Sequence, residues 1–224
     1  MKSNGDDFRL ASAWPWHLSF LALTAGALAI RTPANVGIYL LLLCVAWNLL
    51  FFLWARAERS GMLRQIITFS MLLSLFQVFP DWVLSRHLNV LVFPPDGLFK
   101  WDTVSGYMAL LWAIPASTIL VTYCFVKANT NGKIGFAAAL AVGALLFIGS
   151  EELVWMLPSW YAVNVVMWGH VARYIIVPEI ILTVLIILVF ERVREKSLAY
   201  YVLSAMAVSA TYTAAAVTFY YIAG

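Results

Sequence analysis

Four acidic side chains stand within or at the ends of long apolar segments, where acids are rare. Asp81 lies late in one segment, and the neighbours Glu151 and Glu152 lie late in another. Glu179 follows Pro178 in a third. An ionised carboxylate near the centre of a bilayer costs about 2.5–3.5 kcal/mol on insertion scales, so it usually faces the protein interior, finds a partner or takes up a proton. Because a protonated carboxylic acid in an apolar pocket can act as a general acid, these four acids are the candidate catalytic residues.

Aromatic residues make up 15% of the chain, and several of them accompany the acids along the sequence. Most are expected to serve in packing and in anchoring at the membrane interface. An aromatic face also attracts a cation, by about 2 kcal/mol or more when the pair is desolvated. An acid beside such rings is what protonation of an alkene requires. The candidate substrate-binding residues are Trp82, Tyr107, Trp112, Trp155, Trp168 and Tyr174.

No motif in the sequence indicates a metal, a redox cofactor or a nucleotide. The histidines His17, His87 and His170 lack the paired spacing of a di-iron desaturase. Cys44 and Cys124 are isolated within apolar segments and are expected to be buried free thiols. Dinucleotide and phosphate-binding fingerprints are missing, as is a basic patch with interleaved aromatics. We therefore expect no cofactor, no metal and no nucleic-acid partner.

The elements that position the acids are expected to be membrane helices. The chain of 224 residues is 63% hydrophobic and 11% charged, with a mean hydropathy of +0.88, whereas soluble domains carry about 25% charged residues. Apolar runs of roughly 18 residues or more recur, which is the length that crosses a hydrocarbon core of about 30 Å. We predict an all-α, multi-pass bundle that forms one domain over residues 1–224. Its seven transmembrane helices are expected near 14–31, 36–55, 62–84, 107–127, 134–157, 171–191 and 198–222.

The distribution of lysine and arginine predicts a cytoplasmic N-terminus. In that orientation the inward segments hold ten of these residues and the outward segments hold four, which follows the positive-inside rule. The third and fifth helices then run outward and the sixth runs inward, so the acids fall in the outer half of the membrane. Glu151 and Glu152 point about 100° apart on a helix, so one of them is expected to face water or another helix. In a bacterium the membrane would be the inner one.

Two long connections, residues 85–106 and 158–170, face outward in this topology. They are rich in apolar and aromatic residues such as Phe93, Trp101 and Trp160. Solvated loops rarely have this composition. The two segments are expected either to fold back over a cavity as a lid or to lie at the membrane interface.

The third to sixth helices are consistent with an internal repeat. Each copy has an outward helix that ends with an acid, then a long aromatic segment, then an inward helix with a proline. Pro178 of the second copy is followed by Glu179, whereas Pro115 of the first is followed by Ala116. Membrane proteins often place a site at the interface of two such units.

The second copy resembles the small integral-membrane lycopene cyclases of the bacterial and archaeal type. It is more distantly similar to the membrane-bound terpene cyclases of fungal meroterpenoid pathways. Those families carry an acid, an aromatic loop and then a Pro-plus-Glu motif on the next helix. The matching residues are Glu151, Trp160, Trp168-Gly169 and Pro178-Glu179.

This resemblance implies an isoprenoid cyclase that needs no metal or redox cofactor. Glu179 or Glu151 would protonate an isoprenoid double bond, the aromatic residues would guide the cation, and another carboxylate would remove the final proton. The residues themselves are also compatible with a hydratase or double-bond isomerase of an isoprenoid or sterol. A carrier of a small lipophile or an accessory subunit are the non-enzymatic alternatives, and assembly with itself or with other subunits stays open.

Overall fold

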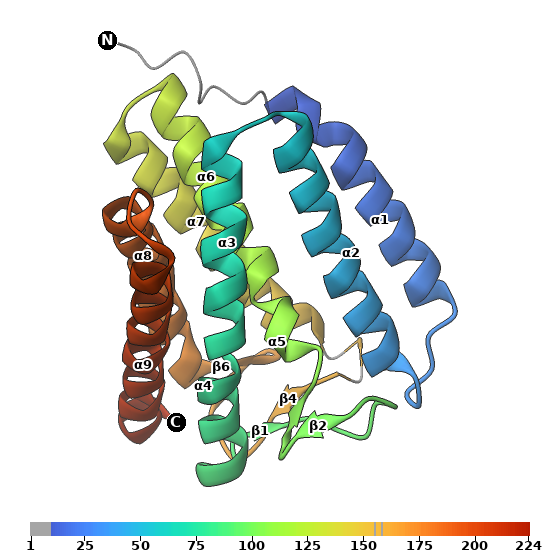
Figure 1. Cartoon of the computed structure of the whole chain (residues 1–224). Helices are drawn as coiled ribbons and strands as arrows, with labels where there is room; N and C mark the ends of the chain where they lie inside the picture. Colours follow the sequence, from blue (N-terminus) through green and yellow to red (C-terminus); the bar gives the residue numbers. More distant parts are fainter. Residues whose placement is uncertain (1–9, 155, 158) are drawn as a thin grey trace.

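The fold is a bundle of long helices capped at one end by short strands (Figure 1). The computed structural model describes residues 10–154, 156–157 and 159–224. A 3₁₀ turn at Leu10–Ala13 leads into the first helix. The helices of the described residues are α1 (Trp14–Ala29), α2 (Val36–Ala57), α3 (Gly61–Phe76), α4 (Val78–Trp82), α5 (Met108–Leu111), α6 (Ala113–Asn129), α7 (Gly132–Val154), α8 (Ile176–Val193) and α9 (Leu198–Ala223). The all-α prediction is confirmed.

Several short helices combine into longer rods. α3 and α4 continue through a π-helical turn, Val83–His87, and α5 leads into α6 with a break at Trp112. A 3₁₀ turn, Arg173–Ile175, precedes α8. The described residues therefore contain seven long helical segments, close to the seven predicted ranges.

Six of these segments are long and apolar enough to cross a membrane, within the part of the chain that the structure describes. They are Val36–Ala57, Gly61–His87, Met108–Asn129, Gly132–Val154, Arg173–Val193 and Leu198–Ala223. α1 has 16 residues, about 24 Å at 1.5 Å per residue, which is shorter than the hydrocarbon core. The protein thus has the architecture of a multi-pass membrane protein.

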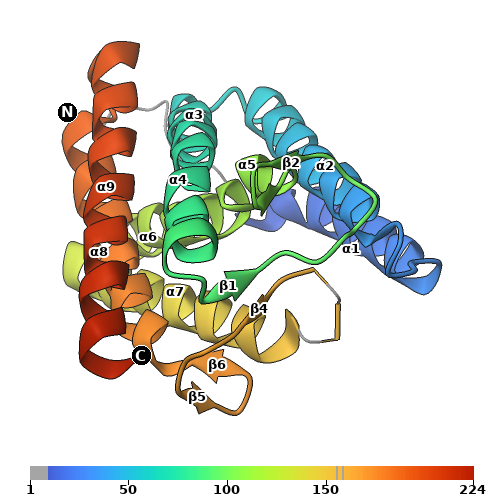
Figure 2. The ribbon, with the colours of Figure 1, turned by 90° about the horizontal axis from the view of Figure 1, so that it is seen from below.

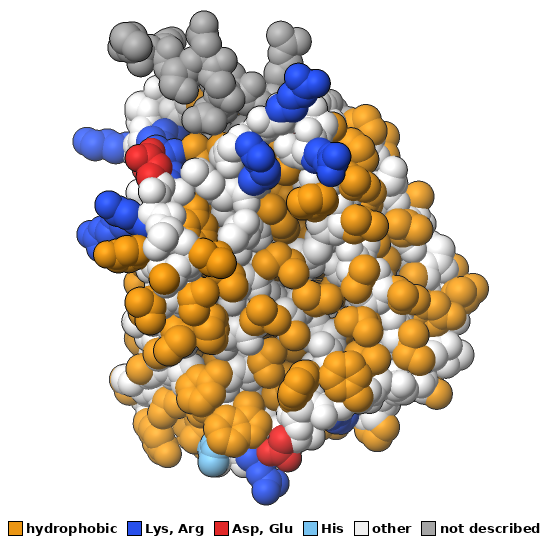
Figure 3. All heavy atoms as spheres, viewed as in Figure 1, with side chains coloured by type: hydrophobic (Ala, Val, Ile, Leu, Met, Phe, Trp, Pro, Cys, Tyr) orange, Lys and Arg blue, Asp and Glu red, His pale blue; other side chains and the backbone are white. Residues whose placement is uncertain are grey.

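The surface has the pattern expected of a protein in a bilayer. Figure 3 shows a wide hydrophobic band, with lysine and arginine side chains gathered at one end of the bundle. This basic end is the one predicted to face the cytoplasm. We call the opposite end, which carries the strands, the outer end.

The core lies between α3, α6, α8 and α9. α3 packs against α6 and α9, and α8 packs against α7 and α9, so that α9 lies between α3 and α8. Aromatic rings fill the centre: the ring of Phe69 lies 5.8 Å from that of Phe190 and 6.1 Å from that of Tyr201, between centroids. α1 packs mainly on α2, and this pair forms the flank of the bundle seen in Figure 2.

Short antiparallel strand pairs cover the outer end (Figure 2). Two of the pairs are hairpins with two-residue turns, and the third joins the two long outward segments. The pairs are β2 (Lys100–Trp101) with β3 (Val104–Ser105), β5 (Met167–Trp168) with β6 (Val171–Ala172), and β1 (Leu91–Val92) with β4 (Tyr161–Ala162).

The strands reveal that the internal repeat is real at the outer end. Each copy has an outward helix, one strand of the β1–β4 pair, a hairpin and an inward helix. The two hairpin turns begin with residues of positive φ, Asp102 at 55° and Gly169 at 59°. Leu91 is equivalent to Tyr161, and Val92 to Ala162. Exchange of the two copies therefore turns the Leu91–Ala162 pair into a Tyr161–Val92 pair, and this second pair is also observed. The β1–β4 pair therefore relates the two copies by a local two-fold axis.

The two copies align differently along their strands and along their inward helices. Asp81 and Glu151 each stand ten residues before their strands, β1 and β4. Counted from the start of β3 and of β6, the residue equivalent to Glu179 is Trp112. Counted from the start of α6 and of α8, Pro115 and Pro178 are each the third residue, and Ala116 stands opposite Glu179 as the sequence indicated.

Two glycines of α7 should respond in opposite ways to alanine. A Cβ at Gly143 would lie 2.5 Å from the side chain of Thr183 on α8, whereas a Cβ at Gly149 meets nothing within 4 Å. Alanine favours a helix over glycine by up to about 1 kcal/mol, and overpacking a core costs about 1–3 kcal/mol. We expect Gly149→Ala to raise the thermal midpoint of the purified protein and Gly143→Ala to lower it. Equal shifts of the same sign would contradict the close contact between α7 and α8.

Candidate active site

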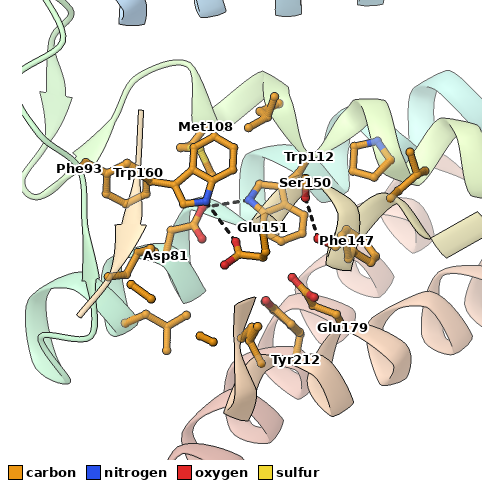
Figure 4. A pocket seen from close by; sticks show the side chains of 18 of the residues that line it. Asp81, Phe93, Met108, Trp112, Phe147, Ser150, Glu151, Trp160, Glu179 and Tyr212 are labelled. Carbon is orange, nitrogen blue, oxygen red and sulfur yellow. Dashed lines mark hydrogen bonds between the residues drawn. The ribbon is translucent and has the colours of Figure 1, made fainter. Parts of the chain in front are cut away.

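A cavity of about 220 Å³ lies inside the outer end of the bundle, between the two repeats (Figure 4). Its walls are mostly apolar and aromatic, and residues of β1, β4 and β6 form part of them. The polar residues that line it are Asp81, Ser150, Glu151, Tyr174, Glu179 and Tyr212. The carboxyl groups of Asp81, Glu151 and Glu179 face this one space (Figure 4).

Asp81 and Glu151 occupy equivalent places in the two repeats, and each accepts a hydrogen bond from an indole, although the two indoles stand at different positions of their repeats. The indole Nε1 of Trp112 donates to Oδ2 of Asp81 at 2.9 Å, and Nε1 of Trp160 donates to Oε1 of Glu151 at 3.1 Å. Each donor belongs to the same repeat as its acid. Hydrogen bonds to a charged acceptor are stronger than those between neutral groups, so both contacts stabilise a carboxylate.

Glu179 has a different environment. Its side chain is only 5% exposed, and its Oε2 is buried without a hydrogen-bond partner among the described residues. The sequence indicated a position two turns inside a helix, but α8 begins at Ile176 and Glu179 lies in its first turn. Pro178 is the third residue of α8, where its missing N–H costs the helix no hydrogen bond.

Aromatic side chains from three helices enclose the carboxyls. The ring of Trp112 lies 5.7 Å from that of Phe147 on α7 and 5.9 Å from that of Tyr212 on α9, between centroids. Tyr174 and Tyr212 are both buried and line the cavity. Tyr212 was not among the predicted residues, since no acid or proline on the last helix marks it. It reaches the site because α9 lies between α3 and α8.

The outward segments act partly as a lid. Leu91, Phe93, Trp160 and Ala162 line the cavity from outside. Trp101 points away and is 61% exposed. The outward segments therefore contain both side chains that cover the cavity and side chains that are exposed on the outer surface.

Four predicted site residues do not line the cavity. Glu152 is exposed, accepts the backbone N–H of His170 at 2.9 Å and lies 3.2 Å from its Nδ1. Tyr107 is fully buried beside the cavity and donates from its hydroxyl to the carbonyl of Ser159 at 3.0 Å. Trp82 donates to Asp102, and Trp168 is 62% exposed. Trp155, the remaining predicted aromatic, lies outside the described residues.

The three carboxyls do not form a metal-ligand cluster. No group of three or more histidine, cysteine, aspartate or glutamate side chains in the described residues could hold a metal ion. Asp81 and Glu151 each accept a hydrogen bond from an indole, and Oε2 of Glu179 has no hydrogen-bond partner among the described residues. The arrangement is suited to moving protons.

Fold and site together define a multi-pass membrane helix bundle with an acidic, aromatic-lined cavity between two repeats. Residues 78–223 match the family described as Domain of unknown function (DUF6989). Because the match covers well over half of the chain, the protein belongs to this family. The matched region contains every residue that lines the cavity. Neither a curated protein nor a solved structure matches the chain significantly.

Proposed function

We propose that the protein is an integral membrane enzyme of isoprenoid metabolism that starts a cyclisation by protonating a double bond. One observation carries this proposal: three carboxyl groups from α4, α7 and α8 face a single cavity with apolar and aromatic walls. A membrane protein gains no stability from leaving three acids around a void. Their convergence is accounted for if a ligand fills the void and exchanges protons with them.

Glu179 is the proton donor in this mechanism. Its buried Oε2 receives no hydrogen bond, so a neutral carboxylic acid fits its surroundings better than a carboxylate does. The proton passes to one alkene carbon and leaves a carbocation on the other. The first turn of α8 then lies beside the new carboxylate, where the helix dipole favours negative charge.

Asp81 and Glu151 are the candidate bases. Each already holds one hydrogen bond from an indole N–H, which stabilises a carboxylate before substrate arrives. A second double bond attacks the carbocation and forms the ring. One of the two carboxylates then removes a proton from the carbon next to the new cation, so that a double bond re-forms. Substrate and product are isomers, and no cofactor is consumed.

The aromatic walls serve the intermediate cation. Trp112 contacts both Phe147 and Tyr212, and all three rings line the cavity. The electron-rich faces of such rings attract a cation without bonding to it, and exclusion of water strengthens the attraction. Cyclisation needs this environment, because water at the cation would form an alcohol instead.

The position of the cavity also helps to choose between an enzyme and the non-enzymatic alternatives. An accessory subunit would need no space beside Glu179, and a carrier would need access from both membrane faces. Within the described residues this cavity lies at the outer end of the bundle, so it favours an enzyme over both. Hydration and double-bond isomerisation use the same acids and differ from cyclisation only in their products.

Lipid extracts of isoprenoid-producing cells test the proposal. Cells would express wild type, Glu179→Gln, Glu151→Gln or the control Glu152→Gln at matched levels. Glu152 adjoins Glu151 but is exposed and pairs with His170. We expect a cyclised lipid in wild type and in the control that is lost in Glu179→Gln. An alcohol or a shifted double bond would identify a hydratase or an isomerase, and identical extracts from all strains would refute an enzyme of this class.

A further inference from the structure

The cavity has an opening in the side of the bundle, at Ser150. Ser150 shares a face of α7 with Gly143, Phe147 and Val154, at helical spacings of seven, three and four residues. Those three residues are buried against the bundle, but Ser150 is exposed although it lines the cavity. A side chain on the packed face of a helix is exposed only where the neighbouring element leaves a gap.

The gap lies at membrane depth. Ser150 is inside the span Gly132–Val154 and about one turn from its outer end. On the same helix Leu145 is 73% exposed and Leu153 is 56% exposed, on the surface that lipid chains would cover. Leu146, one turn before Ser150 on the same helix, lines the cavity and is half-buried, as are the apolar lining residues Leu111 and Ile114. Lipid chains rather than bulk water therefore meet the opening.

Much of the remaining wall is buried. Asp81, Phe93, Tyr174 and Tyr212 are each no more than 5% exposed. The paired strands β1 and β4 lie across the outer side, where the lining residues Leu91, Trp160 and Ala162 are half-buried. Ser150, on the side that faces the bilayer, is the exposed residue of the lining.

The size of the cavity indicates what passes through this opening. Pockets that enclose a complete drug-sized ligand measure roughly 300–1,000 Å³, and this one measures about 220 Å³. We propose that a long, linear isoprenoid enters sideways from the bilayer past Ser150, so that only its reacting end reaches Glu179 while the rest of its chain stays among the lipids. The proposal rests on the proposed function for the reaction, but the route of access can be tested without turnover.

Cysteine labelling in membranes measures the opening directly. Cys44 and Cys124, both buried, would be replaced by alanine, and single cysteines introduced as Ser150→Cys, Leu145→Cys or Ala139→Cys. Leu145 is the lipid-exposed control, and Ala139, on the packed face of the same helix, is the buried control. With a small membrane-permeant maleimide at alkaline pH, where more of each thiol is ionised, we expect position 150 to react at least about tenfold faster than position 139, since reaction needs both a thiolate and access.

A long linear prenol, geranylgeraniol, should then protect position 150 and leave position 145 unchanged. If the thiol at position 150 reacts as slowly as the one at position 139, the cavity has no opening at Ser150 and the proposal is refuted. Equal protection of positions 145 and 150 would overturn the selective route. Neither readout depends on catalysis, so both hold whether or not the lipid extracts contain a new product.

Activity provides the second test. Ser150→Trp would fill the opening, and Gly149→Trp would add the same bulk at a neighbouring position that does not line the cavity and has free space. If extracts contain product, we expect Ser150→Trp to lower kcat/KM by about tenfold or more and Gly149→Trp to leave it near wild type. Unchanged kcat/KM in Ser150→Trp, together with loss of product in Glu179→Gln, would keep the proposed function and reject this route.

Discussion

Glu179→Gln should lower the rate of product formation by about 10²–10⁴-fold, the usual contribution of a general acid. Glutamine keeps the shape of the side chain but has no acidic proton. The Oε2 of Glu179 has no hydrogen-bond partner within the described residues, so the substitution breaks no polar contact and the folded protein should remain abundant. The rate would be measured with purified protein in lipid nanodiscs and a linear isoprenoid.

Two controls sharpen this prediction. Glu179→Asp keeps a carboxylic acid but withdraws it by one methylene, so we expect it to retain more activity than Glu179→Gln. In D₂O, wild type should place one deuterium on the carbon that receives the proton. Wild-type rates in Glu179→Gln with the same deuterium pattern would assign the proton donor to another group.

Trp112→Leu should have the second largest effect, a fall of about 30-fold or more in the rate. A desolvated cation gains about 2 kcal/mol from an indole face, and each 1.36 kcal/mol is worth a factor of ten. Leucine also removes the hydrogen bond to Asp81. Trp112→Phe keeps an aromatic face and loses only the N–H donor, so its fall should be smaller.

Trp82→Leu is the matched control for Trp112→Leu. Trp82 is on the same side of the bundle, but it does not line the cavity and its N–H donates to Asp102 at the outer surface. We expect nearly wild-type rates and products from it. Equal losses in Trp112→Phe and Trp112→Leu would show that the aromatic face contributes nothing, and would leave the hydrogen bond to Asp81 as the role of Trp112.

The helices could be predicted from the sequence because membrane length and apolar composition leave few alternatives. The predicted range 36–55 appears as Val36–Ala57, and 198–222 appears as Leu198–Ala223. The ends of the helices were less predictable where an α-helix continues into another type of turn. The π-helical turn at Val83–His87 and the break at Trp112 depend on local hydrogen bonding that hydropathy does not register.

The site was predictable only in part, for physical reasons. Acids in apolar helices are costly, which is why Asp81, Glu151 and Glu179 could be singled out before their common cavity was known. Tyr212 could not, because a tyrosine on an apolar helix carries no such cost and its place depends on how α9 packs. Which of Glu151 and Glu152 faces inward also depends on the rotation of α7, and the sequence left that open.

The register of β1 against β4 bears on how such a molecule can arise. Two identical copies of one repeat could form the same strand pair, because exchange of the copies leaves the pairing unchanged. In that symmetric dimer both copies would carry the same residue at the positions of Trp112 and Glu179, which are equivalent when counted from β3 and β6. Only after the copies are joined in one polypeptide can one half supply an indole and the other a carboxyl. The fused chain can therefore place an acid in one half and an aromatic wall residue at the equivalent position of the other half. A symmetric dimer of identical copies cannot.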